Sequence, residues 1–409
     1  MNSDKVYNRI KYLIIFTLVT FLVYFQPLEH KPSHIRVLNN SLYTEVVDDE
    51  QENELLRREL SVTGITESQR RLNVEKGEEV INLTKVILFW TSRLDQPDWS
   101  RGVGTKQFQH CPYPNCEYTT EKDRLDDADM LLFYCEELPN FPDRRHPRQL
   151  YVHVTKEAPP NVKINGYGMY DNAINVTASY RKDGTLWFPY FVIRPKENPE
   201  DRYVVRTSYT NRSRSVAWLV SNCNTDSKRE MYINELNKSI TIDVYGACGN
   251  MSCDDEEYKN IDACFKMFEK TYRFYLAFEN NICKDYYTEK LANPFRHEIV
   301  PIVFGGADYE HDFPEHSLIN VIDFPNPEDL AQYLNTMTEV EYDEYLQWKA
   351  KYRVGVKLNH CTLCEFLHDS AYTRGEEILP PSYGGSYSKW WNDSCHNDLI
   401  YELKEKGGW

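Results

Sequence analysis

Positive charge and several familiar catalytic motifs are scarce or missing in this sequence. Its 47 lysine and arginine residues are outnumbered by 63 acidic residues, which leaves a net charge of −16. A surface this negative repels polyanions, so nucleic acid and anionic membrane surfaces are poor partners. The sequence has no Walker loop, Gly-x-Ser-x-Gly elbow or His-Glu-x-x-His, so hydrolase and NTPase functions lack support. A nucleotide in a locally basic pocket stays compatible with this charge.

One apolar run near the N-terminus carries no charge. It covers residues 12–28, and Lys5, Arg9 and Lys11 precede it. This length is the lower limit for a membrane-spanning helix, and basic flanks mark the cytosolic side. We predict a cytoplasmic tail over 1–11, a transmembrane signal anchor over 12–28 and a lumenal body. A cleaved signal peptide is the alternative, but no small-x-small cleavage site follows the run.

Cysteines and glycosylation sequons also favour a lumenal body. The eleven cysteines fit an oxidising compartment, and their odd number leaves at least one thiol free or in an intermolecular bond. A span this short suits the thinner membranes of the early secretory pathway. Seven N-x-S/T sequons are candidate N-glycosylation sites: Asn39, Asn82, Asn175, Asn211, Asn237, Asn250 and Asn392.

A polar segment separates the apolar run from the body. Residues 29–80 contain no cysteine and a single aromatic residue, Tyr43. Such a composition cannot bury enough apolar surface to fold alone, so we predict a flexible stem. A short helical patch around Glu52–Leu60 leaves open a homodimer formed through the stem.

The rest of the chain alternates strands with helices. Strands are expected at Lys85–Trp90, Met130–Cys135, Leu150–Val154, Val216–Val220, Ile242–Tyr245, Phe274–Phe278, Ile299–Phe304 and Leu318–Ile322. Helices are expected from Lys228 to about Ile240, over Tyr286–Arg296 and from Asn326, which caps a helix that opens on Pro327. Two such blocks predict an α/β fold of two Rossmann-like, doubly wound domains facing a cleft. We place these domains at 81–212 and 213–355, followed by a cysteine-containing C-terminal segment over 356–409.

Polar residues gather where strand 274–278 gives way to the next helix. Lys290, in the first turns of the helix expected over 286–296, adds its charge to the positive end of that helix, which suits a pyrophosphate. Glu289, one position earlier, is placed to accept hydrogen bonds from a ribose, as acidic residues do in dinucleotide sites. On pattern alone, a solvated Glu-Lys pair on a surface helix is the alternative.

A second strand end has the same organisation. The strand at 216–220 leads into Ser221-Asn222, and Arg229 lies at the start of the next helix. An arginine there is able to hold a phosphate through two hydrogen bonds. The alternative is an arginine at a helix start that is exposed to solvent and binds no ligand. Two such units in one half of the chain favour a bound diphosphate.

Glu157 is the candidate catalytic residue of the first half. It follows the strand at 150–154 and precedes Pro159-Pro160. A carboxylate at a strand end facing an interdomain cleft is suited to act as general base on an incoming hydroxyl. A surface-loop glutamate is the alternative.

Metal chemistry is the main rival hypothesis. An Asp-x-Asp that holds a divalent ion follows its strand, whereas Asp127-Ala-Asp129 precedes the strand at 130–135. Cys361-x-x-Cys364 has a zinc-like spacing, but in an oxidising lumen we expect disulfides and a local or looped brace. We therefore predict no obligatory metal.

The stretch FYLAFENNICKDYYTEKLANPFRHEIVPIVFGG, residues 274–306, resembles the donor-site signature of the α1,3-fucosyltransferases, F-E-N-S-x followed by D-Y-x-T-E-K. The resemblance continues through INVIDFPNPEDLAQYL, SNCNTDSKREMYINEL and YVHVTKEAPPN. It implies two Rossmann-like domains of the GT-B type, with GDP-fucose bound mainly by the second. It also implies a Golgi type II membrane protein with a lumenal catalytic body.

The resemblance assigns roles by matching position. Glu157 corresponds to the family's general base, which removes a proton from an acceptor hydroxyl while fucose transfers with inversion. No metal is then required, because cations stabilise the departing diphosphate. The residues expected to face the donor are Ser221, Asn222, Arg229, Glu279, Asn280, Tyr287, Glu289 and Lys290.

Departures from the family pattern lie mostly in the acceptor half. Ala158 replaces a usual serine, residues 182–185 read KDGT, and Ala292 replaces a usual tryptophan. The expected acceptor is an N-acetylglucosamine hydroxyl on a glycoprotein glycan, with core N-glycan and Lewis-type antenna both open. The alternatives are a lumenal glycan- or nucleotide-binding protein without catalysis, or a transferase that uses a different nucleotide sugar.

Overall fold

The computed structural model describes residues 84–93, 95–134, 141–162, 171, 173–253, 260–369 and 386–409. The predicted tail, anchor and stem lie outside these ranges, as do Asn39, Asn82 and Cys135. Among the described residues, no helix is both long enough and apolar enough to cross a membrane.

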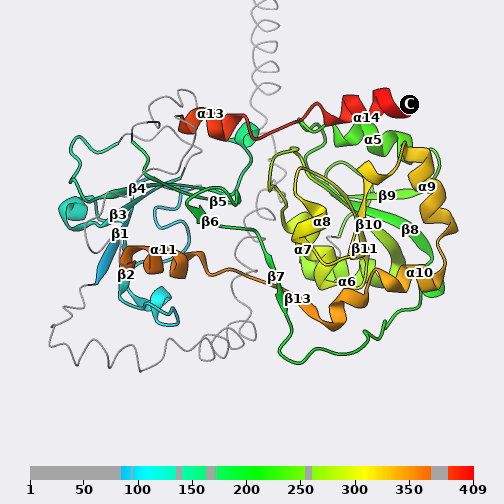
Figure 1. Cartoon of the computed structure of the whole chain (residues 1–409), viewed down its shortest axis with the longest axis horizontal. Coiled ribbons are helices and arrows are strands. Elements are labelled where there is room, and N and C mark those ends of the chain that lie inside the picture. Colours follow the sequence, from blue (N-terminus) through cyan, green and yellow to red (C-terminus); the bar gives the residue numbers. More distant parts are fainter. Residues whose placement is uncertain are drawn as a thin grey trace, which may run out of the picture. The chain divides into compact units, whose positions relative to one another are not determined.

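The first sheet is built from the N-terminal half of the body. Its six strands are all parallel and run in the order β2-β1-β3-β4-β5-β6 (Figure 1). The strands are β1 (Lys85–Phe89), β2 (Cys116–Thr119), β3 (Met130–Tyr134), β4 (Leu150–Thr155), β5 (Val176–Ser179) and β6 (Leu186–Trp187). The central strand β3 is buried along its whole length, as expected for a parallel sheet covered on both faces.

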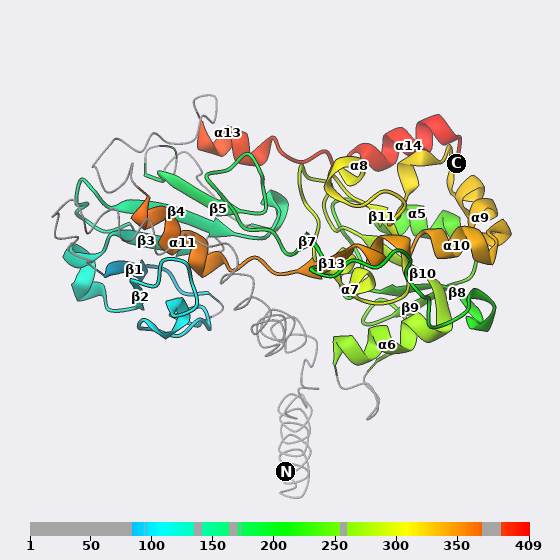
Figure 2. The same cartoon turned by 60° about the horizontal axis from the view of Figure 1, so that its bottom comes forward.

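The second sheet is also parallel, with five strands in the order β12-β11-β10-β8-β9. The strands are β8 (Arg214–Leu219), β9 (Ile242–Tyr245), β10 (Tyr272–Phe278), β11 (Val300–Phe304) and β12 (Ile319–Asn320). Helices cover both of its faces, and Figure 2 shows α6 and α14 on opposite sides. The helices of this half are α5 (Arg229–Leu236), α6 (Ile261–Thr271), α7 (Glu289–Arg296), α8 (Tyr309–Asp312), α9 (Pro327–Thr336), α10 (Glu339–Glu344) and α14 (Leu399–Gly407).

Alternate residues of β10 supply the two cores of this sheet. Phe274 and Leu276 pack with residues of α5, α9 and α10, whereas Tyr275 and Ala277 pack with residues of α6 and α7. The α/β prediction with parallel sheets is therefore confirmed.

The C-terminal segment contributes to the cores of both sheets. A short antiparallel pair, β7 (Val192–Pro195) with β13 (Tyr352–Gly355), precedes it. Beyond β13, α11 (Asn359–His368) packs on one face of the first sheet and α13 (Tyr387–Asn392) on the other (Figure 1). The last helix, α14, then buries Ile400 in a core of the second sheet.

In the part of the chain that the structure describes, five disulfides join ten cysteines. They are Cys111–Cys361, Cys116–Cys364, Cys223–Cys248, Cys253–Cys264 and Cys283–Cys395. Cys361 and Cys364 form disulfides, as expected, but a local brace between the two is wrong, because each binds a different cysteine of the first half. These two cysteines lie three positions apart on α11, on one face of the helix, so both reach the same neighbouring segment.

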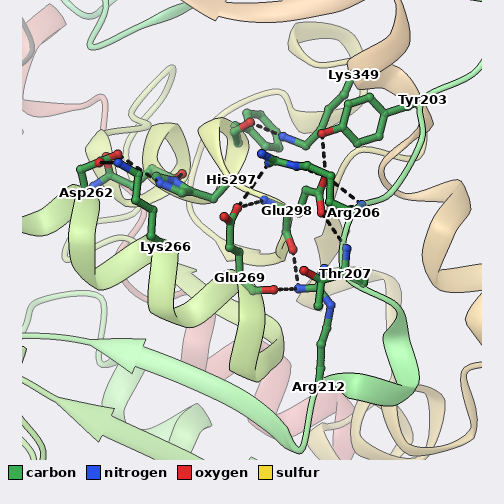
Figure 3. A network of polar contacts seen from close by, with 12 residues as sticks. Tyr203, Arg206, Thr207, Arg212, Asp262, Lys266, Glu269, His297, Glu298 and Lys349 are labelled. Atoms are coloured by element: carbon green, nitrogen blue, oxygen red, sulfur yellow. Dashed lines mark hydrogen bonds and ion pairs between the residues drawn. The ribbon is translucent and has the colours of Figure 1, made fainter. Parts of the chain in front are cut away.

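A buried polar network fastens the segment that leads into β8 (Figure 3). The Glu298 carboxylate accepts hydrogen bonds from Tyr203 Oη at 2.8 Å, Arg206 Nε at 2.8 Å and the Thr207 backbone N–H at 3.3 Å. The fully buried Arg212 donates to carbonyl oxygens that include those of Thr207 and Tyr272, both at 3.2 Å. A buried charge is tolerated when it is hydrogen-bonded in this way, so the network fixes the start of β8.

Candidate functional site

The second sheet has a topological switch point between β8 and β10. From β8 the chain continues to β9 on one side, and from β10 it continues to β11 on the other. Ligands of open α/β sheets bind at the carboxyl ends of strands at such a point. Ser221 and Asn222 follow β8, and Glu279 and Asn280 follow β10. The fold therefore brings together the two strand ends that the sequence singles out.

Arg229 connects these two strand ends. Arg229 is 2% exposed, and its guanidinium donates to the carbonyl oxygens of Phe278 at 2.5 Å and Asn222 at 3.1 Å. Burial lowers the pKa of Arg229, although Glu279 and Glu230 oppose this shift. These contacts give Arg229 a bracing role at the switch point, and its contact with a donor stays a prediction. Ser221 and Asn222 are exposed beside it.

Helix α7 lies at the other side of this site and begins at Glu289, three residues later than the expected start at Tyr286, so Lys290 lies in its first turn. The Thr288 side chain caps the helix, and Glu279 accepts from the Thr288 N–H at 2.8 Å and its hydroxyl at 2.9 Å. Glu279 is 1% exposed, so its carboxylate is occupied inside the protein. Its contact with a donor also stays a prediction, whereas its role in holding the start of α7 follows from these bonds.

Lys290 carries a charge that two carboxylates stabilise. Its Nζ lies 3.2 Å from Glu279 Oε2 and 3.3 Å from Glu289 Oε1. Burial alone would lower the pKa of the Lys290 ammonium, but the neighbouring carboxylates outweigh burial and the pKa is raised. Lys290 and Glu289 are half-buried, which leaves both within reach of a ligand.

Two further predicted donor residues are placed differently from one another. The Oδ1 of Asn280 is buried with no hydrogen-bond partner, an unusual state for a polar atom in a native fold. Tyr287 is buried in a core, where its ring packs against Phe191 and Phe313. Its hydroxyl lies 3.5 Å from the Phe191 carbonyl oxygen, and burial raises its pKa.

Glu157 lies just past β4 of the first sheet and contacts the loop that leads into α7. Its Oε2 accepts from Asn161 Nδ2 at 3.1 Å and from Tyr286 Oη at 3.4 Å. The negative charge of Glu157 is also one of the influences that raise the pKa of Lys290. The candidate base and the candidate donor lysine therefore belong to one electrostatic neighbourhood.

Lys156, next to the candidate base, is a residue that sequence reasoning missed. Burial, together with the positive charges of Arg101 and Arg93, lowers the pKa of Lys156 to about 7. Its Nζ donates to the Pro189 carbonyl oxygen at 3.1 Å. The only sequence signal was its position beside Glu157 at a strand end.

The residues considered for metal binding have structural partners. Asp129 lies at the start of β3, where its carboxylate accepts from Lys85 Nζ at 3.1 Å and the Val86 N–H at 2.9 Å. Among the described residues, two Cys/His groups have the proximity that a metal site needs, but their cysteines are joined as disulfides: Cys111 and Cys361 with His360, and Cys116 and Cys364 with His368.

Five of the seven sequons lie in the described residues. Asn211, Asn237, Asn250 and Asn392 are exposed, whereas Asn175 is half-buried. The Oδ1 of Asn175 accepts from the Tyr151 N–H at 2.9 Å. Occupancy of these sequons stays a prediction.

Comparison with known proteins agrees with the resemblance in the motifs. The description "Fucosyltransferase, N-terminal" matches residues 82–191, and "Glycosyltransferase family 10 (fucosyltransferase) C-term" matches 209–378. Alpha-(1,3)-fucosyltransferase C of Drosophila melanogaster is 31% identical over 353 residues, which cover 78% of this chain and 80% of that protein. Glycoprotein 3-alpha-L-fucosyltransferase A of the same organism is 34% identical over 69% of this chain and 55% of its own length.

A solved α1,3-fucosyltransferase with GDP-fucose is similar with a TM-score of 0.47 at 14% identity, over 70% of this chain and 91% of that one. The evidence for kinship is thus the sequence similarity, which extends over both sheets. The chain belongs to the fucosyltransferases of glycosyltransferase family 10.

Proposed function

We propose that this protein is an inverting α1,3-fucosyltransferase that moves fucose from GDP-fucose to an N-acetylglucosamine hydroxyl on a glycoprotein glycan. The observation that supports this most is the position of Glu157, whose carboxylate contacts the loop between β10 and α7 at Tyr286. A candidate base on one sheet and a donor loop on the other are what a two-substrate transfer needs. The printed names of the relatives support the α1,3 linkage and a glycoprotein acceptor.

Glu157 is the general base of the proposed reaction. It takes the proton of the acceptor hydroxyl while that oxygen forms a bond to the anomeric carbon of fucose. The bond from this carbon to the β-phosphate oxygen breaks, and its electron pair leaves with GDP. Attack from the face opposite the phosphate inverts the anomeric centre.

Lys290 stabilises the negative charge that grows on the departing diphosphate. Its raised pKa keeps the ammonium charged, and its place in the first turn of α7 adds to the positive end of that helix. Glu279 holds it in position, and Glu289 is available for a ribose hydroxyl. Transfer by this route does not require a divalent metal.

We further propose that the two sheets belong to two Rossmann-like domains of the GT-B type, with GDP-fucose held mainly by the second. Residues 12–28 would anchor the protein in the Golgi membrane as a type II protein with its body in the lumen. The support is the charge-free run with its basic flank and the disulfides of the body.

The test is a transfer assay on the full-length protein in detergent. GDP-fucose and a panel of N-glycan acceptors are incubated with and without EDTA, and fucose addition is followed by mass. Transfer that survives EDTA is the expected result, and the acceptor that gains mass identifies the substrate. GDP-fucose binding without transfer to any acceptor would instead favour a binding protein.

A further inference from the structure

Four side chains form an unbroken row of hydrogen bonds from Glu157 to residues 279–288, the loop between β10 and α7, which we call the donor loop. Asn161 Nδ2 donates to Glu157 Oε2, Asn281 Nδ2 donates to Asn161 Oδ1, and Asn397 Nδ2 donates to Asn281 Oδ1, each at 3.1 Å. The row ends at Asn397 Oδ1, which accepts from the Ile282 backbone N–H at 2.7 Å. We call Asn161, Asn281 and Asn397 the amide relay.

The two ends of the amide relay fix its direction. A backbone N–H only donates, so the Ile282 end forces Asn397 to present its oxygen there and its NH₂ group to Asn281. An ionised carboxylate only accepts, so the Glu157 end requires the NH₂ group of Asn161. The orientations of all three amides agree with these two ends. Turning any one amide over would place two acceptors together and two donors together.

The relay is built into rigid surroundings. Asn281 is 1% exposed and lies between β10 and α7, and both polar atoms of its side chain are used by the relay. The disulfide Cys283–Cys395 ties the two segments that carry Asn281 and Asn397. A buried amide whose oxygen and NH₂ group each have a hydrogen-bond partner has one favourable orientation.

We propose that Asn161 and Asn281 are positioning residues that keep Glu157 oriented and ionised for catalysis. This inference rests on the proposed role of Glu157 as base. Hydrogen bonds donated to a carboxylate favour its charged form. The relay therefore favours deprotonated Glu157, the form that is able to take the proton of the acceptor hydroxyl. The other end of the relay lies on the donor loop, which leads to Lys290. One set of hydrogen bonds therefore holds both the donor loop and Glu157.

The test compares pH–rate profiles of the full-length protein and the variants N161L, N281L and N161L/N281L. In N161L, Glu157 keeps the Tyr286 hydroxyl at 3.4 Å but loses the shorter hydrogen bond from Asn161, so the acid limb of kcat should move to higher pH by up to about one unit. N281L should move it in the same direction, because nothing then fixes the amide of Asn161. The double variant should move it no further than N161L, since the two residues act on Glu157 through one hydrogen bond.

Asn326→Leu is the matched control. The Asn326 side chain caps α9 by accepting from the Asp329 N–H at 2.9 Å, so this variant loses stability without touching the relay. It should keep the wild-type acid limb. Acid limbs of N161L and N281L that coincide with that of N326L would overturn the relay. The base is tested apart by Glu157→Gln: if that variant turns over normally, the proposed function falls with the relay, whereas a crippled E157Q beside unshifted relay variants removes the relay alone.

Discussion

Lys290 Nζ and Glu279 Oε2 lie 3.2 Å apart at the point where the loop after β10 enters α7. The carboxylate is buried and also holds the helix-capping Thr288, so one residue fixes both the start of the helix and the position of the ammonium. In the proposed mechanism, an ammonium held in this way meets the diphosphate without having to be ordered first, and such pre-organisation accelerates a reaction.

Glu279→Gln should make the enzyme sensitive to alkaline pH. The substitution keeps an oxygen for Thr288 but removes the negative charge that raises the pKa of Lys290. Burial lowers the pKa of Lys290, and in this variant Glu279 no longer opposes that effect alongside Glu289. Lys290 should therefore lose its proton at a lower pH than in the wild type. A pH–rate profile should show the alkaline limb moved to lower pH.

Glu341→Gln is the control for that experiment. Glu341 is an exposed carboxylate in the capping box of α10, far from Lys290 in the sequence and without contact to it in the described residues. The variant should keep the wild-type alkaline limb. An unchanged limb in E279Q would mean that Glu279 does not set the charge of Lys290.

The two disulfides of α11 should stabilise the fold non-additively. Cys111–Cys361 and Cys116–Cys364 close loops of 250 and 248 residues between nearly the same points. With one bond in place, the second closes a ring of only about ten residues, so it restricts the unfolded chain less than the first bond does. Removing either pair with serines should therefore cost less than half of the stability that is lost when both pairs are removed.

Thermal unfolding of the two double-serine variants and the quadruple variant measures this difference. The C223S/C248S variant serves as a reference, because its loop of 25 residues closes independently of the others. Equal and additive losses from the two α11 pairs would contradict the shared-loop account.

The sequence predicted those parts of the fold that depend on local pattern. Runs such as the one ending at Phe278 are continuously apolar, and their strands lie where the pattern places them. The Asn326 cap and Pro327 mark the start of α9 correctly. The expected helix to Ile240 instead ends at Leu236, because residues 237–239 form turns that lead into β9.

Short elements and long-range pairings could not be read in the same way. Strands β2, β5 and β6 span four, four and two residues, too few to show a period. The partners of Cys361 and Cys364 lie about 250 positions away in the sequence, and no local spacing predicts them. The packing of α11 against the first sheet could not be predicted either, because it also depends on contacts between residues far apart in the sequence.

The candidate site divides along this line. Glu289 and Lys290 could be predicted because a helix start and its charge are local features. Asn281 could not, since its side chain acquires meaning only beside Asn161 and Asn397, which are more than a hundred residues away on either side.

The central claim is that Glu157 removes the acceptor proton. The most direct test is the kcat of Glu157→Gln beside the wild type, with the Kd of GDP-fucose measured on both and exposed Glu315→Gln as the control. General-base catalysis contributes roughly 10²–10⁴-fold, so turnover should fall by that factor while donor affinity stays unchanged. Near-normal turnover in E157Q, with E315Q equal to the wild type, would contradict the account and require another base.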